Sequence, residues 1–66
     1  MIINVNYQRM DVEIDLNIKQ LFSLLKCDLD GHAVAVKQQV IERQKWASYQ
    51  LQENDVVSVF QAIAGG

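Results

Sequence analysis

The chain has 66 residues, of which 50% are apolar and 21% charged, so it has the composition of one folded domain with a small hydrophobic core. A core of this size leaves little room to enclose a substrate, which disfavours a self-contained enzyme. The formal net charge of −2 disfavours a nucleic-acid binder, because such proteins need a basic surface.

Cysteine content and hydropathy bear on the location of the protein. A single cysteine, Cys27, cannot form an internal disulfide, and no Cys/His cluster has the spacing of a metal site. The apolar runs are far shorter than the ~20 residues that cross a bilayer, and residues 1–6 lack the pattern of a signal peptide. We therefore expect a cytoplasmic protein that binds other proteins and neither membranes nor nucleic acids.

The first sixteen residues alternate between apolar and polar side chains. Ile3 and Val5 alternate with asparagines, and after a polar break at residues 8–9 the pattern resumes over residues 10–16. This period of two predicts two half-buried strands in an antiparallel hairpin. The second strand is expected to place one set of side chains in the core and the other in water: Val12, Ile14 and Leu16 inward, and Asp11, Glu13 and Asp15 outward.

An amphipathic helix is predicted next. Asn17 offers a side-chain oxygen that can cap the first N–H groups of a helix. The apolar residues that follow have the spacing of one helical face, namely Ile18, Leu21, Phe22 and Leu25. The helix is expected to end near residues 26–27, because turn-forming residues come directly after them. Its apolar face is predicted to lie across the hairpin.

The second half of the chain predicts more strands. Residues 33–36 form a short apolar run, expected to be a central strand, and residues 38–39 are expected to turn the chain into a brief edge strand at residues 40–41. Residues 43–49, with Trp46 among them, are expected to form a single helical turn or an irregular crossing. A turn is predicted at residues 53–55, followed by a buried final strand over residues 56–60.

This order of elements is that of an α+β, ubiquitin-like β-grasp: a mixed sheet of four to five strands with one main helix packed across it. We expect the β-grasp domain to span residues 1–60. Residues 61–66 then form a flexible C-terminal tail that ends in Gly65 and Gly66.

The two final glycines carry the chemical signal of the sequence. Glycine loses more entropy on ordering than other residues and has no side chain to pack, so folding gives no reason to place two of them here. A six-residue tail can extend about 20 Å from the domain. Without Cβ atoms, Gly65 and Gly66 can pass through a narrow channel and present the terminal carboxyl group to a nucleophile. The alternative is a frayed end without function.

Nearly the whole chain resembles the ThiS family of sulfur carriers, which end in a diglycine. One similar stretch is residues 33–36 together with Val40, Arg43 and Trp46, another is residues 51–57, and the most specific is the terminus, residues 60–66. The sequence departs from the family pattern at three turn or loop positions: Lys37 stands in place of Asn, Glu42 in place of Pro, and Asn54 in place of Gly. These departures bear on loop recognition and leave the tail unchanged.

The resemblance implies a fold, a function and a set of partners. It implies that Gly66 is adenylated by a ThiF-like enzyme, which uses ATP, and is then converted to a thiocarboxylate with sulfur from a donor such as a cysteine desulfurase. A ThiG-like thiazole synthase takes this sulfur for thiamin thiazole synthesis. The chain itself is then a carrier and co-substrate and no enzyme, and it binds neither cofactor nor metal.

Other residues have candidate roles. The resemblance and the position of the last strand make five residues candidates for partner contact: Phe60, Ala62, Ile63, Ala64 and Gly65. Cys27 is interpreted as a small core residue, His32 as a loop residue, and Trp46 as a residue that packs on the sheet. The acidic row Asp11, Glu13 and Asp15 is interpreted as a solvated strand face, with steering of a basic partner as the alternative.

Three other functions remain open at this stage. The small subunit of molybdopterin synthase is a sulfur carrier of the same fold, although its chains are usually longer. A ubiquitin-like modifier would form adducts with lysines through Gly66. A β-grasp interaction domain would keep its activity without Gly65 and Gly66.

Overall fold

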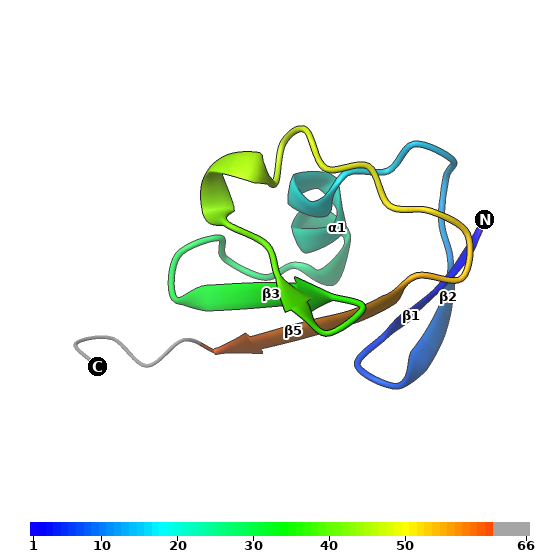
Figure 1. Cartoon of the computed structure of the whole chain (residues 1–66), viewed down its shortest axis with the longest axis horizontal. Coiled ribbons are helices and arrows are strands. Elements are labelled where there is room, and N and C mark those ends of the chain that lie inside the picture. Colours follow the sequence, from blue (N-terminus) through cyan, green and yellow to red (C-terminus); the bar gives the residue numbers. More distant parts are fainter. Residues whose placement is uncertain (62–66) are drawn as a thin grey trace.

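The computed structural model describes residues 1–61. Along the chain, the described elements are the strands β1 (Ile2–Val5) and β2 (Gln8–Asp11), the helix α1 (Ile18–Leu25), the strands β3 (His32–Val36) and β4 (Gln39–Val40), the short 3-10 helix η1 (Arg43–Lys45) and the strand β5 (Val56–Gln61). The strands form one sheet in the order β2-β1-β5-β3-β4. The pair β1 and β5 is parallel, and the other three pairs are antiparallel. Helix α1 lies across one face of this sheet (Figure 1), so the predicted α+β architecture is confirmed.

The hairpin of β1 and β2 turns earlier than predicted. Asn6 and Tyr7 form the turn with φ angles of 50° and 68°. Positive φ at both central residues is typical of the two-residue turn whose twist matches that of the strands it joins. Residues 8–9, the predicted break, therefore belong to β2. The sequence pattern does not indicate this turn, because the alternation of asparagines with apolar residues continues into it.

The predicted inward position of Ile14 is wrong. Val12 and Leu16 are buried as predicted, but Ile14 is 75% exposed. The strand ends at Asp11, and the chain then turns, with Leu16 N–H donating to the Glu13 carbonyl oxygen at 3.3 Å. Once the extended backbone ends, alternation no longer decides which side chain faces the core. The acidic side chains of this segment are exposed as predicted.

Helix α1 begins and ends as predicted. The Asn17 side chain accepts from Gln20 N–H at 2.7 Å, and the Gln20 side chain accepts from Asn17 N–H at 2.9 Å. This reciprocal pair is a capping box, which satisfies two N–H groups that the helix cannot. Lys26 ends the helix in the left-handed conformation, with a φ of 56°. The residues of the apolar face that are fully buried are Ile18, Leu21 and Phe22.

The segment after α1 differs from the prediction in two details. His32, predicted in a loop, is the first residue of β3, and its ring meets the edge of Phe22 with centroids 6.1 Å apart. The turn after β3 is at Lys37 and Gln38, which both have positive φ, so β4 begins one residue earlier than predicted. Both errors are shifts of one residue at element ends.

Trp46 closes the core on the side of η1. Its side chain is buried, as predicted, and its ring centroid lies 4.7 Å from that of Phe22. The indole N–H donates to the Ile41 carbonyl oxygen at 2.9 Å, which satisfies the one polar atom of the ring. Arg43 lies 6.0 Å from the Trp46 ring and pairs with Asp30 at 2.5 Å. This irregular segment is thus tied to the loop after α1.

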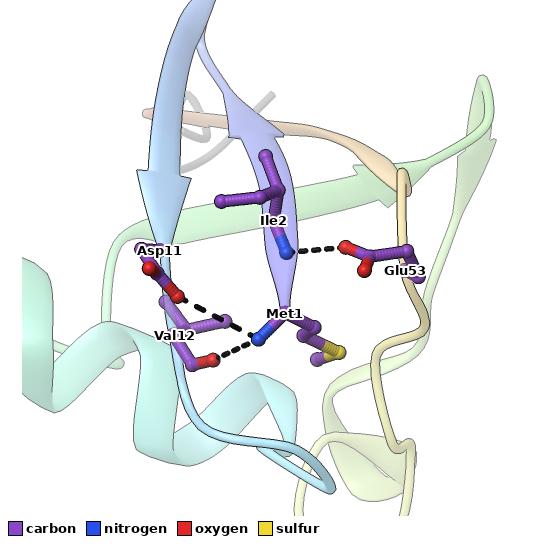
Figure 2. Close-up of polar contacts among 5 residues, drawn as sticks. All are labelled: Met1, Ile2, Asp11, Val12 and Glu53. Carbon is purple, nitrogen blue, oxygen red and sulfur yellow. Dashed lines mark hydrogen bonds and ion pairs between the residues drawn. The ribbon is translucent and has the colours of Figure 1, made fainter.

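The start of β1 is held from both sides (Figure 2). The Met1 amino group donates to the Val12 carbonyl oxygen at 2.6 Å and lies 3.6 Å from an Asp11 carboxylate oxygen. On the other side, Ile2 N–H donates to the Glu53 carboxylate. Within residues 1–61, no helix is long and apolar enough to cross a membrane.

The corrected position of Ile14 predicts different costs for two similar substitutions. We expect Leu16→Ala to lower the free energy of unfolding by about 2–5 kcal/mol, because it opens a cavity in the core. Ile14→Ala should change it by less than about 0.5 kcal/mol, because the side chain is mostly in water. Urea unfolding followed by Trp46 fluorescence measures both. Equal costs for the two variants would place Ile14 in the core after all.

Candidate functional site

The candidate site begins where β5 leads toward the diglycine. Strand β5 lies in the middle of the sheet, pairing with β1 at Val56 and Val57 and with β3 from Val57 to Gln61. Gln61, the first residue of the predicted tail, thus lies opposite His32 in regular strand pairing. The other predicted site residues, Ala62, Ile63, Ala64, Gly65 and Gly66, lie outside the described residues (Figure 1).

The start of β5 is fixed by Asp55, a buried acidic residue. One carboxylate oxygen of Asp55 accepts from Gln52 N–H at 2.8 Å, and the other lies 3.5 Å from the Lys37 ammonium group. Its carbonyl oxygen accepts from Asn4 N–H at 2.9 Å. The carboxylate therefore keeps hydrogen-bond and charge partners in place of the water that it loses on burial.

The predicted turn before β5 is confirmed, and Asn54 explains how it works without the usual glycine. Asn54 has a φ of 69°, in the left-handed region that asparagine tolerates better than most residues. Its N–H donates to the Ile2 carbonyl oxygen at 2.7 Å. The departure from the family pattern at this position therefore leaves the turn intact.

Further along β5, a side chain accepts the hydrogen bond that a neighbouring strand would otherwise accept. Strand β1 pairs with β5 only as far as Val57. Two residues later, Val59 N–H donates to the side-chain oxygen of Asn6 at 2.9 Å. The β1–β2 turn therefore holds the part of β5 that has run past β1, close to the root of the tail.

The two faces of β5 differ, so the predicted burial of the final strand holds for only one of its faces. Val57 is buried against α1, whereas Val56 and Phe60 are 53% and 45% exposed on the opposite face. Phe60 lies opposite Ala33, and Ser58 lies opposite Ala35. We call this side of the sheet the outer face and define it as Val56, Phe60, Ala33, Ala35 and Val40. The role of Phe60 in partner contact stays a prediction.

His32 lies next to the root of the tail, opposite Gln61, with its ring Nδ1 3.3 Å from the Asp30 carbonyl oxygen. Cys27 is half-buried, packs against the core as predicted, and has its Sγ 3.8 Å from the Leu25 carbonyl oxygen. No group of three or more His, Cys, Asp or Glu residues among residues 1–61 has the geometry of a metal site. What the described residues do here is hold an extended backbone in one direction.

One helix across a five-stranded mixed sheet, with a central strand that leads to a diglycine, defines the class of ubiquitin-like β-grasp proteins. Residues 3–66 match the ThiS family. The chain therefore belongs to the ThiS family, and both the predicted family and the predicted fold are confirmed.

The relatives agree with this assignment. The sulfur carrier protein ThiS of Escherichia coli (strain K12) is 35% identical over 61 residues, which cover 92% of each chain. The crystal structure of the thiamine biosynthesis protein ThiS from Geobacter metallireducens is similar with a TM-score of 0.88, 26% identity and full coverage of both chains. The solution structure of a thiamine biosynthesis protein from the same organism has a TM-score of 0.78 and 26% identity, and covers 100% of this chain and 88% of the other.

Sequence reasoning missed three residues that shape the site. Asn6 and Lys37 act on β5 from other parts of the chain, and no local pattern shows such contacts. The exposure of Val56 could have been inferred from the sequence, because residues 56 and 60 of a strand lie on the same face, opposite to residue 57. The predicted role of Phe60 in partner contact implies that this shared face is not fully covered.

We predict that Asn6 slows opening of the backbone at the root of the tail. Asn6→Gly removes the side-chain oxygen while allowing the positive φ, so it isolates the hydrogen bond to Val59. We expect amide hydrogen exchange at Val59 to become about 5–10 times faster, as loss of about 1 kcal/mol implies. Exchange at Val34, which lies opposite Val59 on β3, is the internal control. An unchanged exchange rate at Val59 would show that this hydrogen bond does not slow opening of the backbone.

Proposed function

We propose that this chain carries sulfur for thiamin thiazole synthesis as a thiocarboxylate on Gly66. Membership of the ThiS family gives the general part of this function, a sulfur carrier protein in thiamine biosynthesis. The chemical step, the reacting residue and the partner enzymes are our proposal. The central strand β5, which is paired on both sides and precedes the diglycine in the sequence, is the observation that supports it most.

Where the chain uses glycine supports this role for the tail. Within residues 1–61, seven residues other than glycine have positive φ, a conformation that glycine adopts most easily: Asn6, Tyr7, Asp15, Lys26, Lys37, Gln38 and Asn54. The sequence has three glycines, and two of them are Gly65 and Gly66. The tight turns therefore manage largely without glycine, while the tail has two. A function that needs a thin, unhindered backbone explains this distribution better than folding does.

The geometry fits delivery into an enclosed active site. Beyond Gln61, five residues span at most about 17 Å, which is enough for the terminal carboxyl group to enter a partner while the domain stays outside. The domain fixes the position of the last described residues, since β5 is paired with β3 through Gln61. Holding the reacting group in this way raises its effective concentration in the partner site.

The proposed chemistry begins with activation, because a carboxylate is a poor electrophile. A ThiF-like partner transfers AMP from ATP to the Gly66 carboxylate and releases pyrophosphate. The terminal sulfur of a persulfide, supplied through a cysteine desulfurase, then displaces AMP from the carbonyl carbon. A thiol cleaves the resulting sulfur–sulfur bond and leaves the thiocarboxylate, which a ThiG-like thiazole synthase uses as a nucleophile.

In this scheme the chain is a carrier and co-substrate. ATP binds to the partner, and this chain binds neither a cofactor nor a metal of its own. The acids and bases of each step belong to the partner enzymes. Because the activating step consumes ATP and cleavage of the sulfur–sulfur bond consumes a free thiol, we place the cycle in the cytoplasm.

The central prediction concerns the mass of Gly66. After reaction with its adenylating enzyme, ATP and a persulfide donor, the intact chain should replace one oxygen by sulfur, localised by fragmentation to Gly66. A variant lacking Gly66 should show no exchange and should unfold at the same urea concentration as the full chain. Exchange in the shortened variant would refute the assignment of the site. Lysine adducts would instead indicate a protein modifier.

A second prediction concerns docking through the outer face. We expect Phe60→Ala to lower kcat/KM for adenylation by about tenfold or more, since exposed aromatic side chains often carry much of the binding energy. Ile14→Ala is the matched control, because Ile14 is an apolar residue that is 75% exposed in the segment after β2 and does not belong to the outer face. The circular dichroism of both variants should be unchanged. Equal rates for Phe60→Ala and the unchanged chain would exclude Phe60 from the docking surface.

A further inference from the structure

A groove runs between the end of β2 and helix α1, with a volume of about 500 Å³. Its apolar lining comes from Val12, Leu16 and Leu24, and its strand side from Asp11 and Glu13. Leu24 is 54% exposed although it is a large apolar residue on a helix. The function proposed above makes no use of this groove.

The edge of β2 beside the groove has free backbone groups. Met1 and Val12 form a doubly hydrogen-bonded pair, with N···O distances of 2.6 and 2.8 Å. Such pairs alternate along an antiparallel ladder, so the next bonded pair is Ile3 with Met10. The N–H and C=O groups of Asp11 therefore point away from β1. Because β2 is the outermost strand of the sheet formed by residues 1–61, these groups face no other strand there.

The side chains along this edge alternate in character. Met10 and Val12 pack on the core side, whereas Asp11 and Glu13 are exposed. Asp11 and Glu13 both line the groove, whereas Arg9, which shares the exposed face of β2 with Asp11, lines a separate hollow beside β1. A segment in the groove would therefore meet apolar side chains and two carboxylates. The matching pattern in a partner is an extended segment in which apolar residues alternate with lysine or arginine.

The groove and the C-terminal end of β5 lie at different ends of the sheet. Strands β1 and β5 are parallel, and β2 runs antiparallel to β1, so Asp11 lies beside Ile2, at the end opposite to Gln61. Figure 1 shows β5 ending on one side of the molecule and the N-terminal end of β1 on the other. A segment in the groove therefore does not obstruct an enzyme that holds the tail.

We propose that the groove between β2 and α1 binds an extended, basic and apolar segment of a partner protein by strand addition to β2. The apolar side chains of this segment lie over Val12, Leu16 and Leu24, and its cationic side chains meet Asp11 and Glu13. Such a contact tethers the carrier to a partner while the tail is delivered elsewhere. It is independent of the sulfur chemistry proposed for Gly66.

The test uses the full chain and a short synthetic peptide in which valines alternate with lysines. Titration followed by amide chemical shifts should give changes confined to residues 9–16 and 20–24. Leu24→Ala and Glu13→Lys should each weaken binding about fivefold or more, while Val40→Ala on the opposite sheet edge leaves it unchanged. Both groove substitutions are at exposed positions, so the variants should remain folded.

Control peptides separate the two parts of the proposal. A peptide with glutamates in place of the lysines should bind at least about tenfold more weakly, and one with a central proline should not pair with β2. Shift changes on the outer face or on β4, or full binding by Leu24→Ala, would overturn the proposal. Concentration-dependent pairing of β2 with a second copy of the chain, in the absence of peptide, would overturn it as well.

Discussion

The position of β5 in the centre of the sheet is the constraint on which the rest of this structure depends. It pairs with β1 on one side and with β3 on the other, so the two hairpins form one sheet only through β5. Lys37 and Gln52 hold Asp55 just before the strand, and Asn6 holds Val59 within it. The same contacts that complete the sheet thereby fix β5 up to Gln61, from which the chain continues to the diglycine.

A single helix explains why the surface is available for partners. Helix α1, with Trp46 beside it, covers one face of the sheet and takes up the large side chains of the core. Among the described residues nothing covers the other face, so Val56 and Phe60 remain partly exposed although they belong to the central strand. In a domain this small, a second layer would require residues that the chain does not have. Apolar surface is thus left next to the tail, where a partner enzyme is proposed to dock.

The predictions from sequence succeeded where local chemistry decides. The cap at Asn17, the apolar face of α1 and the left-handed turn at Asn54 follow from interactions within a few residues, and all three are confirmed. They failed where extended backbone ends, as at Ile14, and where one face of a strand lacks a cover, as at Val56. Alternation shows which residues share a face, but it does not show where the strand stops or what lies against it.

By itself, the sequence determined the order of the elements, most of the core and the family, and it singled out Gly65 and Gly66. The elements and the core follow from side-chain type and spacing, because these decide the interactions between residues close together in the chain. The family followed from the resemblance of its motifs. Only the tertiary structure decided that Asn6 supports Val59, that Lys37 pairs with the buried Asp55, and that a groove opens beside the free edge of β2. Such contacts join residues far apart in the chain, and their existence depends on how the hairpins and the helix pack around β5.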